Sequence, residues 1–482
     1  MRCASGRRVR RDRTAWALRA ADVAALGVRK PLPRRGLVRP LDRVAGVRST
    51  RGEVPERRAT AVVRAALVAC VAIALVRDWR FTETSPGIDF YQFWAIGRLI
   101  ERRDALDVYA RVERDRLGRE LFEEALRSGG PRQIAAATRR QDLETYGTPL
   151  LYAASRALST GDYETDFRNF RLLALASLVA GAWAIGRAAG VSVEVNLALL
   201  FFFAAAFEPV ASNLRVGNLN CLQLAMLGAY LAAARLRDAR LAGGAGGAIL
   251  AGAVLLKPNL AHAVALLVAS WITARRWRAL AAHAVGAAAA AVAAIAGSAA
   301  SFGSPRPWLH WASALAGLPD VQITLALGNY APSRLVWELL RIDASIPLSA
   351  AALAIAAIAI ARAPRRAEAA RDRAAPEALV VAVGCLAMLV GSRLVWLHYE
   401  VLAIPMLLLL FRPLESDRRG GWEIAARRGL PVIALLALSL RPLLVAGLVE
   451  DPLWVAASVC VGTLLLFALG VRELWLQRGV HS

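Results

Sequence analysis

Apolar segments of membrane-spanning length recur along this chain from about residue 60 to the C-terminus. A bilayer core about 30 Å thick needs about 20 apolar residues in each crossing helix. A backbone in lipid must also satisfy its own hydrogen bonds, so such segments predict helices. The composition is 57% hydrophobic, which is too apolar for an ordinary soluble protein. The chain is therefore expected to be an all-α polytopic membrane protein.

Twelve candidate spans predict a bundle of about 12 transmembrane helices. The candidates are 60–76, 170–187, 191–209, 218–234, 244–256, 258–273, 279–301, 345–361, 376–391, 396–411, 430–448 and 452–471. The segment 148–158 is too short to cross, and we expect it to be a re-entrant or interfacial piece.

The formal net charge of +23 is distributed in a way that predicts membrane orientation. Residues 1–58 hold sixteen arginines and Lys30 against five acids, and are expected to be a basic, disordered cytoplasmic tail. Residues 59–475 are expected to form the transmembrane domain. Its loops 77–147 and 302–344 are balanced in charge and are expected outside, with amphipathic helices in the first. Both termini would then face the cytoplasm of a multi-pass cell-membrane protein.

The same distribution argues against a nucleic-acid partner, because the excess basic charge lies in the tail and in short links between spans. The expected macromolecular environment is membrane lipid. The five cysteines and five histidines show no CxxC or HxxxH spacing. No metal and no cofactor are therefore expected.

Several polar residues fall near membrane depth on the side predicted to be extracytoplasmic. They are Asp89, Tyr146, Arg215, Asn218, Asn220, Lys257, Asn329, Arg393, His398 and Tyr399. Ionisable groups at this depth are costly unless they pair or bind a ligand, so they are functional candidates. Their shared side predicts one site on that face of the membrane.

Lys257 lies in the apolar stretch "VLLKPNLA" and is one of only two lysines among the 60 basic residues. The simpler interpretation is an interfacial lysine that extends from a helix end towards water. The functional interpretation is a compact ammonium placed against an anion such as phosphate. Pro258 breaks the helix here and Arg215 comes from another outer turn, which favours the phosphate hypothesis.

Asp89 lies just beyond the first span in "SPGIDFYQFWAIGR". Alone, an acid in this place is interpreted as a solvated loop residue, whereas a carboxylate in an aromatic setting can serve as a general base. The neighbouring rings suit either a sugar or an interfacial belt. His398, beside Tyr399, is either a satisfied helix histidine or a phosphate or hydroxyl contact.

The order of these motifs resembles a known family. The segments "DFYQFWAIGR", "YGTPLLY", "RVGNLNCLQL", "VLLKP", "GNYAPS" and "WLHYEVLAIP" are similar to bacterial glycosyltransferase family 87, and the resemblance covers roughly residues 60 to 450. Members of that family are GT-C mannosyltransferases that use polyprenyl-phosphate mannose. The resemblance implies a GT-C-type bundle that transfers a hexose, mannose in the family, to a lipid-linked or cell-envelope glycan acceptor.

The resemblance also implies residue roles. Asp89 matches the catalytic base of the family. The donor phosphate and the substrate would be bound by Arg215, Lys257, His398, Tyr146, Asn218, Asn329 and Tyr399. The chain departs from the family at Gly147–Thr148, where a Tyr-Pro-Pro turn is usual, and at Asn218, where the family has glutamine.

Three other interpretations remain open from the sequence. A transporter or flippase of a lipid-linked sugar would also need polar groups in the membrane, but no internal repeat is present. Another GT-C enzyme, for aminoarabinose or protein O-mannosylation, would be expected to carry paired acids, whereas Ile88 and Phe90 flank Asp89. The third is a structural membrane protein without chemistry.

Overall fold

The computed structural model describes residues 53–102, 107–316, 324–362, 374–412 and 421–476. Every regular element in these ranges is a helix, and the one β-bridge among them joins Asn329 to Trp396. The all-α prediction is confirmed. The predicted tail, 1–58, lies outside the described residues up to position 52, and α1 begins at Glu53.

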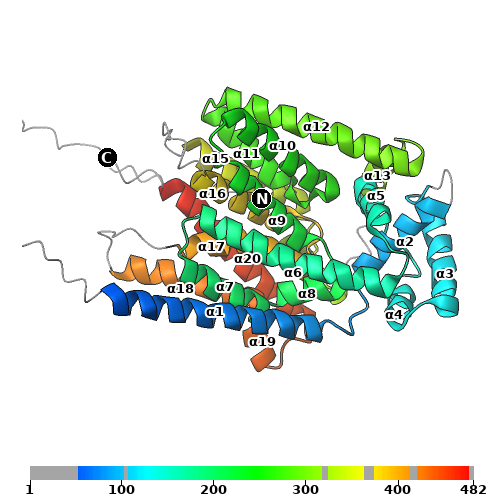
Figure 1. The fold of residues 1–482 in the computed structure, drawn as a ribbon, viewed down its shortest axis with the longest axis horizontal. Helices are drawn as coiled ribbons and strands as arrows, with labels where there is room; N and C mark the ends of the chain where they lie inside the picture. The colour runs from blue at the N-terminus through cyan, green and yellow to red at the C-terminus, as the bar shows by residue number, and fades with distance from the viewer. Residues whose placement is uncertain (1–52, 103–106, 317–323, 363–373, 413–420, 477–482) are drawn as a thin grey trace, which may run out of the picture. The chain divides into compact units, whose positions relative to one another are not determined.

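The helices run in an order that Figure 1 shows by colour and label. Those of the N-terminal half are α1 (Glu53–Phe81), α2 (Ile88–Arg102), α3 (Arg111–Ser128), α4 (Pro131–Arg139), α5 (Pro149–Leu158), α6 (Tyr163–Ala188), α7 (Val193–Ala206), α8 (Glu208–Val216) and α9 (Asn220–Ala233). Those that follow are α10 (Ala239–Leu256), η1 (Pro258–Leu260), α11 (Ala261–Thr273), α12 (Trp277–Phe302), α13 (Pro307–Ala316), η3 (Leu325–Leu327), α14 (Pro332–Leu340) and α15 (Ser345–Arg362). The last are α16 (Ala374–Gly391), η5 (Leu397–Ala403), α17 (Ile404–Leu410), α18 (Gly421–Ser439), α19 (Arg441–Val445) and α20 (Pro452–Leu476).

Six helices in the described ranges are long and apolar enough to cross a membrane. They lie in α1, α6, α10, α12, α15 and α20, and the pair α7–α8, bent by 58°, gives a seventh if it counts as one span. Four other predicted spans contain apolar helices of 10–17 residues, which are shorter than a bilayer core at 1.5 Å per residue. The predicted span 430–448 falls on the end of α18, which has 19 residues but is not among the helices that qualify as spans, and on α19. The count of about 12 crossings is therefore not confirmed and stays a prediction.

Glycines let the helices of the bundle approach closely. A Cβ on Gly247 of α10 would lie 2.0 Å from the carbonyl oxygen of His283 in α12. A Cβ on Gly286 of α12 would lie 1.9 Å from the carbonyl oxygen of Gly244. Backbone-to-backbone packing of this kind is typical of membrane helices. The outward surfaces carry exposed apolar residues such as Val292, as expected where lipid replaces water.

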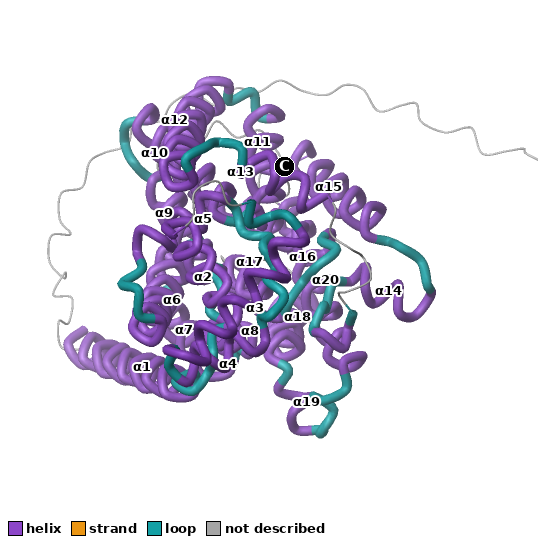
Figure 2. The backbone as a smooth tube through the Cα atoms, turned by 90° about the vertical axis from the view of Figure 1, so that its right-hand side faces the viewer, coloured by secondary structure: helices purple, strands orange, loops and turns teal. Residues whose placement is uncertain are grey.

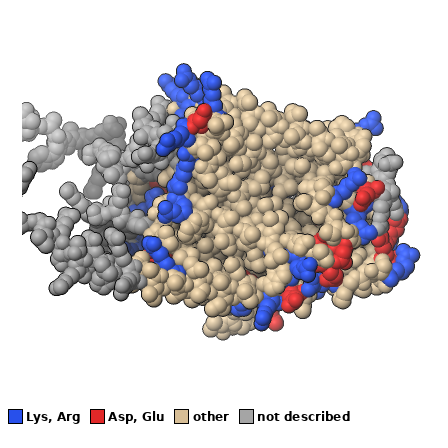
Figure 3. Space-filling view, viewed as in Figure 1, with Lys and Arg blue, Asp and Glu red and all other residues tan. Residues whose placement is uncertain are grey.

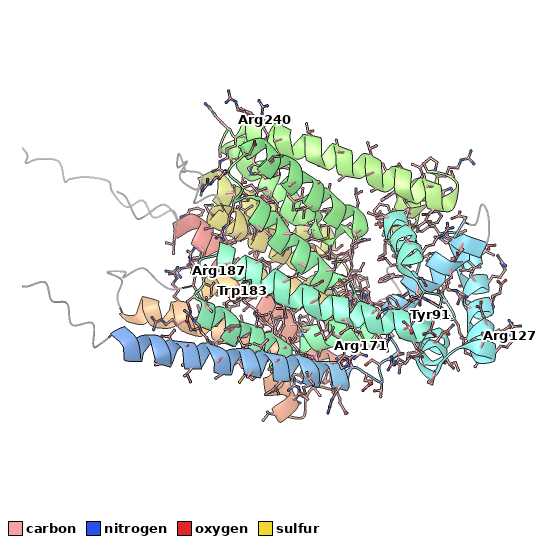
Figure 4. The ribbon with its side chains drawn as sticks, viewed as in Figure 1. Tyr91, Arg127, Arg171, Trp183, Arg187 and Arg240 are labelled. Carbon is pink, nitrogen blue, oxygen red and sulfur yellow. The ribbon has the colours of Figure 1, made fainter. Side chains whose placement is uncertain are left out.

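The two ends of the bundle differ in charge. In Figure 3, one end of the visible face carries mainly Lys and Arg, the other mixes basic and acidic residues, and a band largely free of charged residues lies between them. Figure 4 places Arg187 and Arg240 at the first end and Tyr91 and Arg127 at the other. An apolar band between polar ends is typical of a protein that spans a membrane.

Helices α2–α5 lie together at the mixed-charge end, which faces the viewer in Figure 2. The amphipathic helix expected in 77–147 is clearest in α3, which buries Leu117, Leu121 and Ala125 on one face. By contrast, α2 is mostly buried, with Tyr91 and Trp94 packed against Tyr163 of α6. The first loop is therefore partly a folded layer of the protein.

Candidate active site

Asp89 is placed by a tight turn at the start of α2. Gly87 precedes the helix with φ of +70°, and a Cβ there would lie 2.5 Å from the ring of Phe167. The hydroxyl of Tyr163 donates to the carbonyl of Gly87 at 3.0 Å, which fixes the turn from α6. Asp89 lies in the first turn of α2, where an acid is stabilised by the helix dipole.

The Asp89 carboxylate has partners from three distant segments. Arg140 Nη2 donates to Oδ1 at 3.0 Å, and Asn218 Nδ2 donates to Oδ2 at 2.7 Å. His398 Nε2 lies 3.5 Å from Oδ2. The side chain of Asp89 is only 15% exposed. The solvated-loop interpretation of Asp89 is therefore wrong, because the structure holds it in a buried polar cluster.

Asn218 reaches Asp89 because α8 ends in a left-handed turn. Gly217 has φ of +74°, and a Cβ at this position would lie 2.5 Å from Cβ of Phe90. Asn213 Nδ2 donates to the carbonyl of Asn218 at 3.1 Å and holds the turn closed. Only glycine fits this approach of α8 to α2, and it brings the Asn218 amide against Asp89.

Lys257 terminates α10, and Pro258 begins the short helix η1 directly after it. Its Nζ donates to Oδ1 of Asn218 at 2.6 Å and to Oδ1 of Asn220 at 3.1 Å. The ammonium also lies 4.1 Å from the ring centroid of Tyr399, a cation–π distance. Lys257 thus points into the polar cluster, towards Asp89, and not outward from the helix end.

The charge of Lys257 is finely balanced by this environment. Burial lowers the pKa of the Lys257 ammonium to about 7, and the attraction of Asp89 opposes that shift. An anion bound beside Lys257 would favour the protonated form. The geometry therefore suits an ammonium that completes its charge pairing when an anionic ligand enters.

His398 is held by its neighbours at the start of η5. Asn220 Nδ2 donates to the carbonyl of His398 at 2.8 Å, and the rings of His398 and Tyr399 meet edge to face with centroids 5.0 Å apart. The imidazole is 7% exposed, and its Nε2 makes no hydrogen bond within the described part of the chain. A buried nitrogen next to a carboxylate is available to a ligand.

Asn329 supports this arrangement from outside the cluster. Its Oδ1 accepts from the backbone N–H of Val395 at 3.0 Å, and its Nδ2 donates to the carbonyl of Arg393 at 2.9 Å. The Asn329–Trp396 bridge continues this pairing to the residue before η5. Asn329 thus fixes the backbone that presents His398.

Arg215 and Tyr146 are not in contact with the cluster. Arg215 forms an ion pair with Glu208, and its guanidinium lies 5.9 Å from the ring centroid of Phe81. The carbonyl of Tyr146 accepts from Trp311 Nε1 at 3.1 Å, and its ring lies 5.7 Å from the guanidinium of Arg114. The donor-binding roles expected for both residues remain predictions.

The turn that carries Tyr146 nevertheless touches the Lys257 segment. The Thr148 hydroxyl donates to the carbonyl of Leu256 at 3.1 Å and accepts from the N–H of Leu151, so that it caps α5. Gln223 Nε2 donates to the carbonyl of Lys257 at 2.8 Å. The turn therefore connects α5 to the end of α10, although its residues differ from those of the usual family turn.

One cluster residue, Arg140, was not predicted from the sequence. It is one of thirteen arginines in 77–147 and lies 51 positions from Asp89, with no local pattern that marks it. Asn220 was expected among the polar residues of the outer side but was given no role, because turn asparagines are common. The fold brings Arg140 to Asp89 and Asn220 to Lys257.

The sequence profile of glycosyltransferase family 87 matches residues 146–392, just over half of the chain. The chain belongs to glycosyltransferase family 87. No curated protein and no solved structure matches it. The family makes this protein a membrane glycosyltransferase. Asn218 and Lys257 lie within the matched range, whereas Asp89 and His398 lie outside it, so the fold links them to the family segment.

No group of three or more metal-ligating His, Cys, Asp or Glu residues occurs in the described ranges of this family 87 protein. The cluster offers instead a carboxylate, an ammonium, two amides and an imidazole. Asp89 connects to Lys257 through one side-chain amide, that of Asn218. This set can accept a proton at one end and stabilise an anion at the other.

Proposed function

We propose that this glycosyltransferase transfers a hexose, mannose by its family resemblance, from a polyprenyl-phosphate sugar to a lipid-linked or cell-envelope glycan. The observation that carries the proposal is the hydrogen-bonded chain Asp89–Asn218–Lys257, with His398 against Asp89. It supports the proposal because a carboxylate that can act as a base and an ammonium that can bind phosphate lie in one hydrogen-bonded cluster, and transfer from a phosphate-linked sugar needs both groups.

The proposed reaction is a direct displacement with inversion at the anomeric carbon. The acceptor hydroxyl oxygen forms the new bond to that carbon, and its proton passes to Asp89. The bond from the anomeric carbon to the phosphate oxygen breaks, and the electron pair leaves with polyprenyl phosphate. Lys257 and His398 stabilise the phosphate charge that develops. Arg215 would act as a further cation after exchanging Glu208 for the phosphate.

The site is proposed to face the extracytoplasmic side. The helices α10 and α11 meet at Lys257, and their other ends lead to the arginine-rich links around Arg240 and Arg276. Arginine-rich links are typical of the cytoplasmic side. The cluster at Lys257 would then open outward, in agreement with the mixed charges of α2–α4 (Figure 3).

The test is transfer of labelled mannose from polyprenyl-phosphate mannose into a native membrane extract, by membranes that contain wild type or Asp89→Asn. EDTA is present throughout, because the proposed chemistry uses no metal. Glu123→Gln on the exposed face of α3 is the matched control for loss of one acid. We expect label with wild type and the control and none with Asp89→Asn.

Equal labelling by Asp89→Asn would show that Asp89 is not the base. No labelling by any variant would show that the donor or the acceptor is wrong. A flippase of a lipid-linked sugar would then become the leading alternative, and it would be measured by translocation of a fluorescent polyprenyl-phosphate sugar in vesicles.

A further inference from the structure

Arg140 makes an unusual set of contacts with the start of α2. It follows the last residue of α4, and its side chain is 14% exposed. Its guanidinium donates to Oδ1 of Asp89 at 3.0 Å and to the carbonyl of Ile88 at 3.4 Å. A second nitrogen, Nη1, lies 2.9 Å from Oε2 of Glu144. One guanidinium thus holds the Asp89 side chain and its preceding backbone together.

The two oxygens of Asp89 consequently face different charges. Oδ2 meets Asn218 and His398, the side of the cluster that leads to Lys257. Oδ1 meets Arg140, which belongs to the α4 segment. A carboxylate held at both oxygens has a single orientation, and a base in displacement chemistry needs that fixed geometry.

Glu144 balances Arg140 from the solvent side. Its carboxylate is 45% exposed, whereas the Arg140 side chain is largely covered. The guanidinium is therefore shared between a partly exposed acid and a buried one. This sharing divides the attraction of the Arg140 guanidinium between the carboxylates of Asp89 and Glu144.

We propose that Arg140 is a positioning residue for the general base: it fixes the orientation of the Asp89 carboxylate, and Glu144 in turn holds the Arg140 guanidinium. The inference rests on the proposed function of Asp89. Arg140 itself transfers no atom. Nothing in the family match points to it, because residue 140 precedes the matched range 146–392.

The direct contacts of Arg140 differ from those of Lys257. Arg140 contacts Asp89, the carbonyl of Ile88 and Glu144. Lys257 contacts Asn218, Asn220 and Tyr399. Arg140 and Glu144 can therefore be changed without removing a direct partner of Lys257.

The experiment measures the initial rate of mannosyl transfer from labelled polyprenyl-phosphate mannose into native membrane extract, at several donor concentrations, for wild type, Arg140→Gln, Arg140→Lys and Glu144→Gln. These rates separate the maximal rate from the KM for the donor. Glu144→Gln leaves the contact between Arg140 and Asp89 in place, so it is expected to lower the maximal rate less than Arg140→Gln does.

The maximal rate of Arg140→Gln is expected to fall about 10- to 100-fold because the base is less well oriented, while the KM for the donor stays within about twofold. Arg140→Lys is expected to recover part of the rate. Arg139→Gln, an exposed neighbour on α4, is the matched control and is expected to match wild type.

A lower maximal rate of Arg140→Gln at an unchanged donor KM, with partial recovery in Arg140→Lys, supports the inference. Wild-type rates in Arg140→Gln would overturn it, and so would a loss that Arg140→Lys does not recover at all, which indicates a structural role. If Arg140→Gln does not insert, Arg140→Lys and Glu144→Gln decide: a lower maximal rate at unchanged KM supports the inference, and wild-type rates in both variants overturn it. Full activity of Asp89→Asn would instead overturn the proposed function itself.

Discussion

Two buried carboxylates, Asp89 and Glu377, lie near opposite ends of the same helices. α9 begins with Asn220, in the Asp89 cluster, and carries Tyr230 near its other end, where the hydroxyl donates to Glu377 at 2.9 Å. α11 begins just after Lys257 and carries Trp271 near its end, whose Nε1 donates to Glu377 at 3.4 Å.

The two carboxylates differ in the further contacts that their partners make. Arg276 lies 3.6 Å from Glu377, and with Tyr230 and Trp271 it completes a set of donors that tie α16 to α9 and α11. At Asp89 the partners lead onward to the ammonium of Lys257 and include an imidazole nitrogen without a hydrogen bond in the described structure. A buried carboxylate whose donors make no further link, such as Glu377, indicates a structural role. A buried carboxylate linked to a second charge that is incompletely paired, as Asp89 is to Lys257, indicates a functional site.

The different roles of the two carboxylates are tested most directly by neutralising each of them in turn. Asp89→Asn is expected to lower transfer by about 100-fold or more, because the general base is lost. Glu377→Gln is expected to keep turnover per folded molecule and to lower the free energy of unfolding by about 1–3 kcal/mol. Transfer assays and thermal unfolding in detergent measure the two effects. A reversal of this pattern would mean that the two clusters have been assigned the wrong way round.

Lys257 tests whether the second charge of the Asp89 cluster binds phosphate. Lys257→Met is expected to lower transfer by about 100- to 1000-fold, as for loss of a donor to a developing anion. Burial lowers the pKa of Lys257 to about 7 in the wild-type protein. The cation is therefore present below that pH and lost above it, so kcat/KM for the donor is expected to fall as pH rises through about 7.

Lys257→Arg is the control for this pH dependence. The guanidinium stays protonated, so any remaining activity is expected to fall only at much higher pH. Rates at several donor concentrations and pH values give kcat/KM for both proteins. An unchanged fall near neutral pH in Lys257→Arg would assign the titration to another group.

Gly217→Ala tests whether the backbone turn that presents Asn218 to Asp89 is needed. Alanine there would have to keep φ of +74° and would place its Cβ 2.5 Å from Phe90. The turn that presents Asn218 to Asp89 is expected to shift, with an activity loss of about 10-fold and a stability loss of about 1–2 kcal/mol. Gly161→Ala is the control, since it also has positive φ, +89°, but no atom within 4 Å of the added Cβ. Equal activity losses in both variants would remove the special role of the Gly217 turn.

The smallest expected effect comes from Tyr230→Phe. It removes one donor to Glu377 and leaves the carboxylate with Trp271 and Arg276. We expect a stability loss of about 1 kcal/mol and unchanged transfer per folded molecule. Thermal unfolding and the mannosyl-transfer assay together check it. A large fall in turnover would show that the Glu377 end is coupled to the reaction.

The class of this protein, a helical membrane protein, and most of its candidate site residues could be predicted from the sequence alone. Apolar segments predict helices in lipid whatever their partners are, because no other structure satisfies the backbone there. A lysine in an apolar stretch and an acid among aromatic rings are unusual enough to identify Lys257 and Asp89. The motif order also predicted the family that the profile match shows.

The lengths of the helices, the contacts between distant residues and the polar side chains that are already paired are seen only in the tertiary structure. The bend of 58° between α7 and α8 and the short helices η1 and η5 were not indicated by hydropathy. Arg215, which looked like a partner of Lys257, is paired with Glu208. Arg140, unmarked among thirteen arginines, contacts Asp89. A charge pair depends on distance in space, and sequence separation does not encode that distance in a loop of balanced charge.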